Sequence, residues 1–246
     1  MTYEKVQVPT RDGVCPVHVF TPASGTISPA IVFYMDAGGV RPAELQMARR
    51  LAEAGYVVLL PDLFYRYGAY GPFDPVEVFK GDVRAILGPL MATTDNEKAA
   101  EDTRALLTYL DTRTDVARKR IGAVGFCMGG GMAIAAAGTF PERFAAVASF
   151  HGGNLATDAP ASPHRYATRL KAEVYIAAAE GDASYPPDMA QRLERAFDEA
   201  GVRYRAQTYA GAAHGWMKPD FPVYDPVAAE EGWSNMIAFF DRILKS

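Results

Sequence analysis

The strongest chemical signal in this 246-residue chain is a cysteine between two glycines, Cys127 in the run 125–129. A β-like run, 120–124, precedes it and a helix-like run, 132–137, follows it. Strand, sharp turn and helix are the context of a nucleophile elbow, G-x-S-x-G, here with cysteine in place of serine. A thiol at a helix N-terminus is favoured as thiolate. We therefore interpret Cys127 as a nucleophile rather than as a small buried apolar residue.

An acid and a base follow this cysteine in the order of α/β-hydrolase triads: nucleophile, acid, base. Asp182 comes shortly after a buried strand-like run, and His214 lies in a glycine-rich loop after the last such run. Catalytic groups of these folds lie beyond the carboxyl ends of parallel strands, where three such side chains can meet. We predict that His214 acts as general base and then acid, and that Asp182 orients its imidazole.

Other residues compete for two of these roles. His151 also follows a strand, but it precedes the acid in the chain, and Glu180 and Asp188 lie near Asp182. His214 could also be an ordinary loop histidine, and Asp182 could be a turn or helix cap.

The elements that must position these groups alternate between buried strands and amphipathic helices, a pattern that predicts a parallel sheet. A hairpin around 10–13 joins two antiparallel edge strands, 5–9 and 14–20. Residues 74–91 are expected to be helical with a break at 88–89, and a short helix is expected at 165–170. The remaining predicted strands are 30–35, 56–60, 120–124, 144–150, 173–179 and 203–209, and the longer helices are 41–54, 95–112, 187–200 and 226–244.

Composition excludes several classes of function. Hydrophobic residues make up 49% of the chain, the net charge is -4, and acids and bases are mixed, which does not indicate a nucleic-acid surface. No apolar run approaches the roughly 20 residues of a membrane span, and the N-terminus lacks a signal-peptide core, so we expect a soluble, cytoplasmic protein. Two cysteines without a C-x-x-C motif indicate neither zinc nor dithiol chemistry. No linker divides the chain, which predicts one domain over 1–246.

Together with 61–63 (Pro-Asp-Leu), 180–182 (Glu-Gly-Asp) and 213–215 (Ala-His-Gly), the cysteine run resembles the dienelactone hydrolase (carboxymethylenebutenolidase) family of α/β-hydrolases. The resemblance extends from about residue 5 to residue 243. It implies an eight-stranded, mostly parallel sheet with helices on both faces. It also implies hydrolysis of a cyclic enol ester without metal or cofactor. The family's Cys, Asp and His fall on Cys127, Asp182 and His214.

The resemblance also concerns how the thiol is activated. The family has a thiol-activating glutamate at the end of the strand that here ends in Asp36, which is shorter by one methylene. A turn role is the alternative for Asp36. The oxyanion hole would consist of the backbone N–H groups of Ala37 and Met128.

The family's substrate carries a carboxylate that arginines bind, one of them four residues after the catalytic histidine. That position is Lys218 here, a point charge rather than a planar fork. Arg66 or Arg84 could supply the other cation. Aromatic side chains that could line an apolar pocket are Tyr65, Tyr67, Phe73 and Trp216.

The sequence thus predicts a hydrolase of ester or lactone bonds that works through a Cys-His-Asp triad and a thioester acyl-enzyme. Two alternatives remain: a carboxylesterase or thioesterase with the same triad, and a non-catalytic binding protein of the same fold. The expected partner is a small ester or lactone, which in the family's case is anionic. We expect neither a nucleic acid nor a membrane as partner. The protein is expected to be a monomer or a small homo-oligomer. Whether 64–94 forms a lid is left open.

Overall fold

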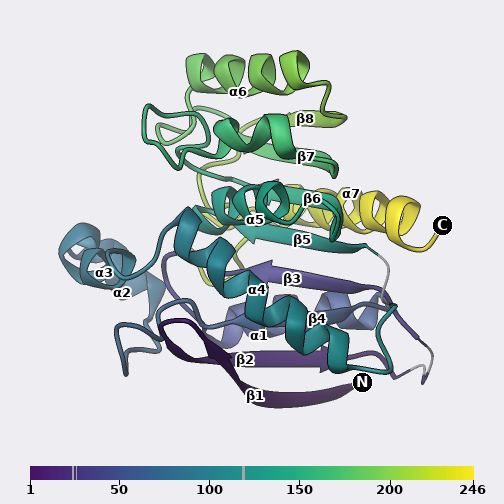
Figure 1. Ribbon diagram of the computed structural model, residues 1–246. Helices are drawn as coiled ribbons and strands as arrows, with labels where there is room; N and C mark the ends of the chain where they lie inside the picture. The colour runs from purple at the N-terminus through teal and green to yellow at the C-terminus, as the bar shows by residue number, and fades with distance from the viewer. Residues whose placement is uncertain (24, 26, 118–119) are drawn as a thin grey trace.

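The computed structural model describes residues 1–23, 25, 27–117 and 120–246. In this part of the chain eight strands form one sheet, in the order β1-β2-β4-β3-β5-β6-β7-β8 (Figure 1). The sheet is mostly parallel and carries helices, which confirms the predicted α/β-hydrolase fold class. The strands are β1 (Thr2–Thr10), β2 (Gly13–Thr21), β3 (Ala30–Tyr34), β4 (Val57–Pro61), β5 (Ile121–Phe126), β6 (Phe144–Phe150), β7 (Glu173–Ala179) and β8 (Tyr204–Tyr209).

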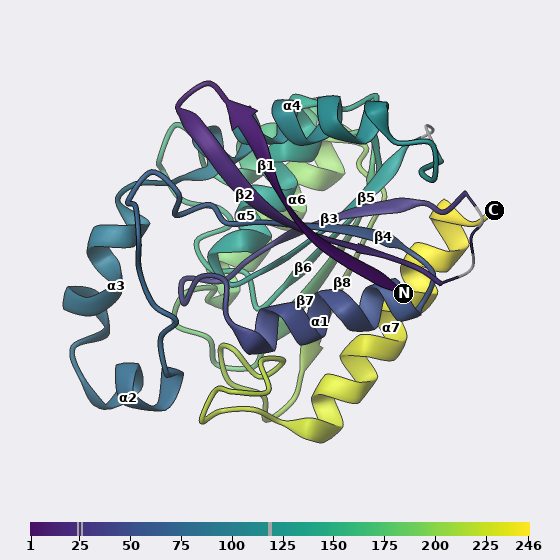
Figure 2. The same ribbon diagram turned by 90° about the horizontal axis from the view of Figure 1, so that it is seen from below.

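Helices cover both faces of this sheet. Seen along the sheet in Figure 2, α1 and α7 lie on one face, and α4, α5 and α6 lie on the other. The short helices α2 and α3 stand apart, beyond one end of the strands (Figure 1). The helices are α1 (Pro42–Glu53), α2 (Pro75–Lys80), α3 (Val83–Met91), α4 (Asn96–Thr112), α5 (Met128–Thr139), α6 (Pro187–Ala200) and α7 (Pro226–Leu244), with a 3₁₀ helix, η1, at Pro163–Arg169.

Burial explains the sequence of the central strands. Every residue of β3, β4 and β5 is buried, because helices cover both faces of the sheet there. At one edge, β1 pairs with β2 through the predicted hairpin, with Thr10 opposite Gly13. The neighbouring strands β3 to β8 pair in parallel, so their carboxyl ends form one common edge.

The segment 74–91 differs from the prediction in the position of its break. The chain forms two helices, α2 and α3, and the break lies at Gly81 rather than at 88–89. Asp82 decides this, because its side chain accepts a hydrogen bond from the Ala85 N–H and so caps a new helix. Pro89 lies within α3 without ending it.

No helix in the described residues is long and apolar enough to cross a membrane.

Candidate active site

Cys127 lies at the tip of a sharp turn between β5 and α5. Its backbone angles, φ 54° and ψ -120°, are outside the regions that side chains prefer. The flanking glycines permit this turn. A Cβ on Gly125 would lie 1.8 Å from the Gly129 carbonyl oxygen, and one on Gly129 would lie 2.3 Å from that of Tyr34. The local geometry is therefore that of a nucleophile elbow.

His214 and Asp182 meet beyond the ends of β8 and β7. His214 Nδ1 donates to Asp182 Oδ2 at 2.6 Å, and the Asp182 side chain is almost fully buried. Burial lowers the pKa of His214, but its hydrogen bonds to Asp182 and to Cys127 outweigh this and raise the pKa to about 10. The structure thus brings Cys127, His214 and Asp182 together in that order.

Ser184 completes this arrangement, although the sequence analysis did not single it out. Its Oγ donates to Asp182 Oδ1 at 2.6 Å, its backbone N–H donates to the same oxygen at 2.8 Å, and Oγ lies 3.1 Å from His214 Nδ1. Desolvation raises the pKa of Asp182, yet the hydrogen bonds from His214 and Ser184 bring it below its usual value. The available signal was the Asp-x-Ser spacing, which is typical of a turn in which an Asp side chain binds the backbone.

His151, the rival base, lies beside His214 but is fully buried. The two rings meet edge to face with centroids 5.4 Å apart. Neither ring nitrogen of His151 has a partner among the described residues, and burial holds its pKa far below the usual range. His151 is therefore an uncharged packing partner of His214. Glu180 instead accepts a hydrogen bond from the backbone N–H of Gly211.

Trp216 also belongs to the core rather than to a binding pocket. It is completely buried, and the centroid of its ring lies 4.3 Å from that of the Tyr209 ring. The prediction that Trp216 contacts substrate is not supported by this position.

Asp36 is the residue whose surroundings differ most from expectation. Both of its oxygens bind Arg41, Oδ1 at 2.7 Å and Oδ2 at 2.9 Å, and Oδ1 also accepts the N–H of Gly38. Burial favours the protonated form, but Lys218 and Arg41 overcome this and hold the pKa of Asp36 far below its usual value. No described hydrogen bond joins Asp36 to Cys127. Its carboxylate is instead held in a buried bidentate ion pair.

Lys218 is enclosed in the same group of charges. Its side chain has no exposed surface, and Nζ lies 2.6 Å from Glu44 Oε1 and 3.6 Å from Asp36 Oδ2. Nζ also lies 4.0 Å from the centroid of the Phe126 ring. The expectation that Lys218 binds a substrate carboxylate is not supported, because its ammonium is already paired and out of reach of solvent.

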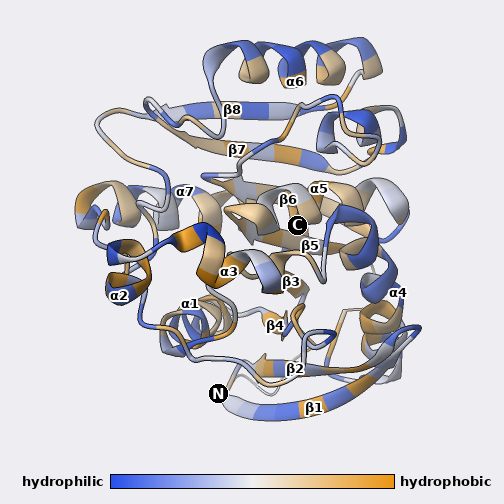
Figure 3. Ribbon diagram, turned by 90° about the vertical axis from the view of Figure 1, so that its left-hand side faces the viewer, coloured by the Kyte–Doolittle hydropathy of each residue, from blue (hydrophilic) through white to orange (hydrophobic). Residues whose placement is uncertain are grey.

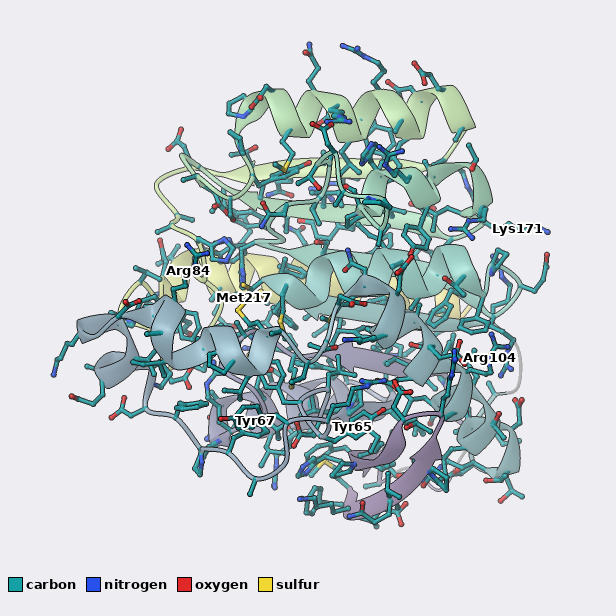
Figure 4. All side chains as sticks on the ribbon, turned by 60° about the vertical axis from the view of Figure 1, so that its left-hand side comes forward. Tyr65, Tyr67, Arg84, Arg104, Lys171 and Met217 are labelled. Atoms are coloured by element: carbon teal, nitrogen blue, oxygen red, sulfur yellow. The ribbon has the colours of Figure 1, made fainter. Side chains whose placement is uncertain are left out.

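Of the two candidates for the second cation, Arg84 lies on α3 and is not among the described lining residues of either pocket at the thiol, and Arg66 is paired elsewhere. Arg66 donates to both oxygens of Asp102 and forms an ion pair with Asp12 in the β1–β2 turn. Tyr65 and Tyr67 lie on the same side of the molecule, below α3 in Figure 4. Arg66 therefore fastens the loop after β4 to the hairpin, and the structure does not place it at the thiol.

The two predicted oxyanion donors flank the thiol. Two pockets share Cys127 and His214; Met128 lines one of them and Ala37 lines the other. Met128 is the first residue of α5, so its N–H has no partner within the helix. The bond from Gly38 to Asp36 fixes the loop that carries Ala37.

Two pockets open from Cys127 and His214. One, of about 260 Å³, is bordered by polar side chains that include Asn96, Asn154 and Ser184. The other, of about 160 Å³, lies under α2 and α3. The segment 64–94 therefore supplies one wall of the site. Among the residues that the structure describes, no three His, Cys, Asp or Glu side chains form a metal-binding group.

Comparisons with known proteins identify the family to which this chain belongs. The model of the dienelactone hydrolase family matches residues 16–244. A protein of Methylorubrum extorquens, provisionally named a carboxymethylenebutenolidase, is 27% identical over 240 residues, which are 96% of this chain and 79% of that one. A protein of the same provisional name from Salmonella typhi is 26% identical, covering 95% and 84%. The crystal structure of a provisionally assigned dienelactone hydrolase from Klebsiella pneumoniae superposes with a TM-score of 0.85 at 22% identity, covering 98% of both chains.

Proposed function

Because the chain belongs to the dienelactone hydrolase family, whose members hydrolyse ester and lactone bonds, we propose that Cys127, His214 and Asp182 act as a catalytic triad. The observation that supports this most is the position of His214. It is hydrogen-bonded to Asp182 at 2.6 Å on one side and to Cys127 on the other, and it borders both pockets. A base held between an acid and a nucleophile is the arrangement that covalent hydrolysis requires.

In the first half-reaction the Cys127 thiolate attacks the carbonyl carbon of the substrate, and a carbon–sulfur bond forms. The N–H groups of Ala37 and Met128 stabilise the oxyanion. The tetrahedral intermediate then breaks its bond to the leaving oxygen, which takes a proton from the His214 imidazolium. The product is a thioester, with the alcohol released or, for a lactone, retained on the acyl chain.

In the second half-reaction His214 is neutral and acts as a base. The thioester sulfur carries no negative charge, so one of the interactions that raise the pKa of His214 is absent at this stage. His214 takes a proton from water as the water oxygen attacks the thioester carbon. The intermediate expels the Cys127 thiolate, and the carboxylic acid leaves. The imidazolium and thiolate are then both restored.

In this proposal Asp36 has the turn role that the sequence left as an alternative, and not the thiol-activating role that the resemblance implied. Its two oxygens are occupied by Arg41 and Gly38, so it supports the oxyanion loop rather than exchanging a proton with the thiol. Activation of Cys127 then depends on His214. Arg41 is a positioning residue for this loop.

The test is to trap the acyl-enzyme with p-nitrophenyl acetate and measure intact mass together with release of p-nitrophenol. We expect one acetyl group on Cys127, and a loss of turnover of at least about a thousandfold in Cys127→Ala. Cys15→Ser is the matched control, because Cys15 is buried away from the pockets and burial raises the pKa of its thiol. Equal turnover by wild type and Cys127→Ala would exclude the triad, and rates of both at the uncatalysed background would favour a non-catalytic binding protein.

A further inference from the structure

The smaller of the two pockets lies directly beside the thiol. Its volume is about 160 Å³, and Cys127 and His214 form part of its wall. The loop 36–38 closes one side, and α2 and α3 close the other. A group bound here would therefore be attached to, or adjacent to, the carbonyl that Cys127 attacks.

The wall of this pocket is almost entirely hydrocarbon. Val78 and Leu87 are buried on the inner faces of α2 and α3. Phe79 and Val83, which also line the pocket, are 47% and 37% exposed. In Figure 3 these two helices project from the body of the molecule and carry orange, hydrophobic residues among blue, hydrophilic ones. Apolar side chains left open to water at a pocket mouth are typical of a site that an apolar ligand covers.

Apart from the His214 imidazolium and the backbone N–H of Ala37, which act on the reacting carbonyl, the pocket offers no partner for an anion. No Lys or Arg is among its described lining residues. Asp36 faces it, but both oxygens of Asp36 already bind Arg41. Lys218 is enclosed against Glu44, and Arg66 is paired with Asp102. While the reacting carbonyl engages His214, a second, carboxylate group of the substrate in this pocket would lose its hydration and gain no ion pair of its own, which is costly.

We infer that this pocket binds an uncharged hydrocarbon part of the substrate, no larger than a phenyl ring or a short alkyl chain, so that the protein prefers neutral esters or lactones to carboxylate-bearing ones. The size follows from volume, since an apolar cavity of about 150 Å³ accommodates benzene. For its ester chemistry, this inference rests on the proposed function.

The first measurement compares kcat/KM for p-nitrophenyl valerate and for the mono-p-nitrophenyl ester of glutaric acid. These two esters differ only in a terminal methyl or carboxylate. We expect the valerate ester to be preferred at least tenfold. In the neutral series from acetate to valerate, kcat/KM should rise up to about fourfold per methylene, and it should level off once the pocket is full. Equal or better turnover of the glutarate ester would overturn the inference.

A second measurement tests the pocket without requiring turnover. The rate of Cys127 alkylation is compared for N-phenyl iodoacetamide and N-(4-carboxyphenyl) iodoacetamide, each divided by its rate with glutathione. A tenfold preference for the neutral reagent supports the pocket even if no ester is hydrolysed, in which case only the proposed function fails. Ester turnover with no preference between the reagents would overturn the inference and leave the proposed function standing.

Two valine variants connect either result to this pocket. Val83 and Val76 are both exposed, on α3 and α2, but only Val83 lines the pocket. Val83→Arg should shift both ratios toward the carboxylate-bearing compounds by at least fivefold, and Val76→Arg should leave them unchanged. The same shift in both variants, or in neither, would contradict the assignment.

Discussion

Replacing Lys218 by methionine should destabilise the protein by an amount that increases with pH. The ammonium of Lys218 is fully buried, 2.6 Å from Glu44 Oε1 and 3.6 Å from Asp36 Oδ2. Methionine keeps an unbranched apolar side chain of similar length and removes only the charge. The carboxylates then have Arg41 as their remaining buried cation.

The size of the destabilisation caused by Lys218→Met depends on whether the Glu44 carboxyl is protonated. Burial raises the pKa of Glu44 to about 7, against the opposing effects of Lys218 and Arg41. Without Lys218 this pKa rises further. Because the pKa is higher in the folded than in the unfolded state, the associated stability is present at low pH and is lost as pH rises through the folded pKa.

At pH 6 the variant therefore keeps Glu44 protonated, and the cost is close to that of one hydrogen bond, about 1 kcal/mol. At pH 8.5 the Glu44 carboxyl group of the variant must either ionise in the core without Lys218, or stay protonated at a pH where it is ionised in the unfolded chain. Removing one member of a buried ion pair costs about 3–5 kcal/mol. The difference between the two pH values, about 2 kcal/mol or more, is the predicted quantity.

The assay is urea unfolding at pH 6 and pH 8.5 of wild type, Lys218→Met, Glu44→Gln and the double variant. In Glu44→Gln no carboxylate remains at this position to lose its partner, so adding Lys218→Met should cost less than it does in wild type. Lys80→Met is the control, since Lys80 pairs with Glu77 on the surface and such pairs are worth about 0–1 kcal/mol. A cost of Lys218→Met that is independent of pH, or additive with Glu44→Gln to within about 0.5 kcal/mol at pH 8.5, would refute this reasoning.

Three further predictions concern the elbow, the triad and the loop after β4. Gly125→Ala should lose more than about 4 kcal/mol of folding free energy or fail to fold, because its Cβ would meet the Gly129 carbonyl, whereas Gly88→Ala, with open space around it, should gain about 0.5–1 kcal/mol in urea unfolding. Ser184→Ala should lower kcat/KM about three- to tenfold with little change in melting temperature, since Asp182 loses one of its hydrogen bonds; unchanged kinetics would contradict this role. Tyr70→Phe should cost about 1–3 kcal/mol in urea unfolding, because its hydroxyl donates to Asp62 at 2.6 Å and accepts from the Val40 N–H; a cost no larger than that of exposed Tyr67→Phe would count against it.

The fold could be predicted because its signals are local. Continuous apolar runs indicated the buried strands β3, β4 and β5, and the Asp-Gly turn indicated the β1–β2 hairpin. The break between α2 and α3 was misplaced, because the cap at Asp82 begins a new helix there and the Gly-Pro pair at 88–89 does not end it. Competition between a helix cap and a helix breaker depends on small differences in free energy, and a residue pattern does not give their relative size.

The candidate site was likewise predictable only in those features that depend on local sequence. The glycines around Cys127 and the chain order of Asp182 and His214 are properties of the sequence itself, and a parallel sheet brings its strand ends together in any case. The positions of Asp36 and Lys218 also followed from their places after β3 and after His214. Their partners did not, because Lys218 binds Glu44 from 174 residues away and Arg41 binds Asp220 from 179 residues away.

Residue types and short-range spacing were thus enough to indicate the candidate nucleophile, acid and base, and the sheet that positions them. Whether a charged side chain is free to meet a substrate depends on which distant carboxylates the folded chain places beside it, and on whether water reaches the pair. Pairing of Lys218 with Glu44 and of Arg66 with Asp102 kept these two expected cations out of the pocket and left a hydrocarbon wall beside the thiol. That outcome is a property of three-dimensional packing, because ion pairing and desolvation act through space and not along the chain.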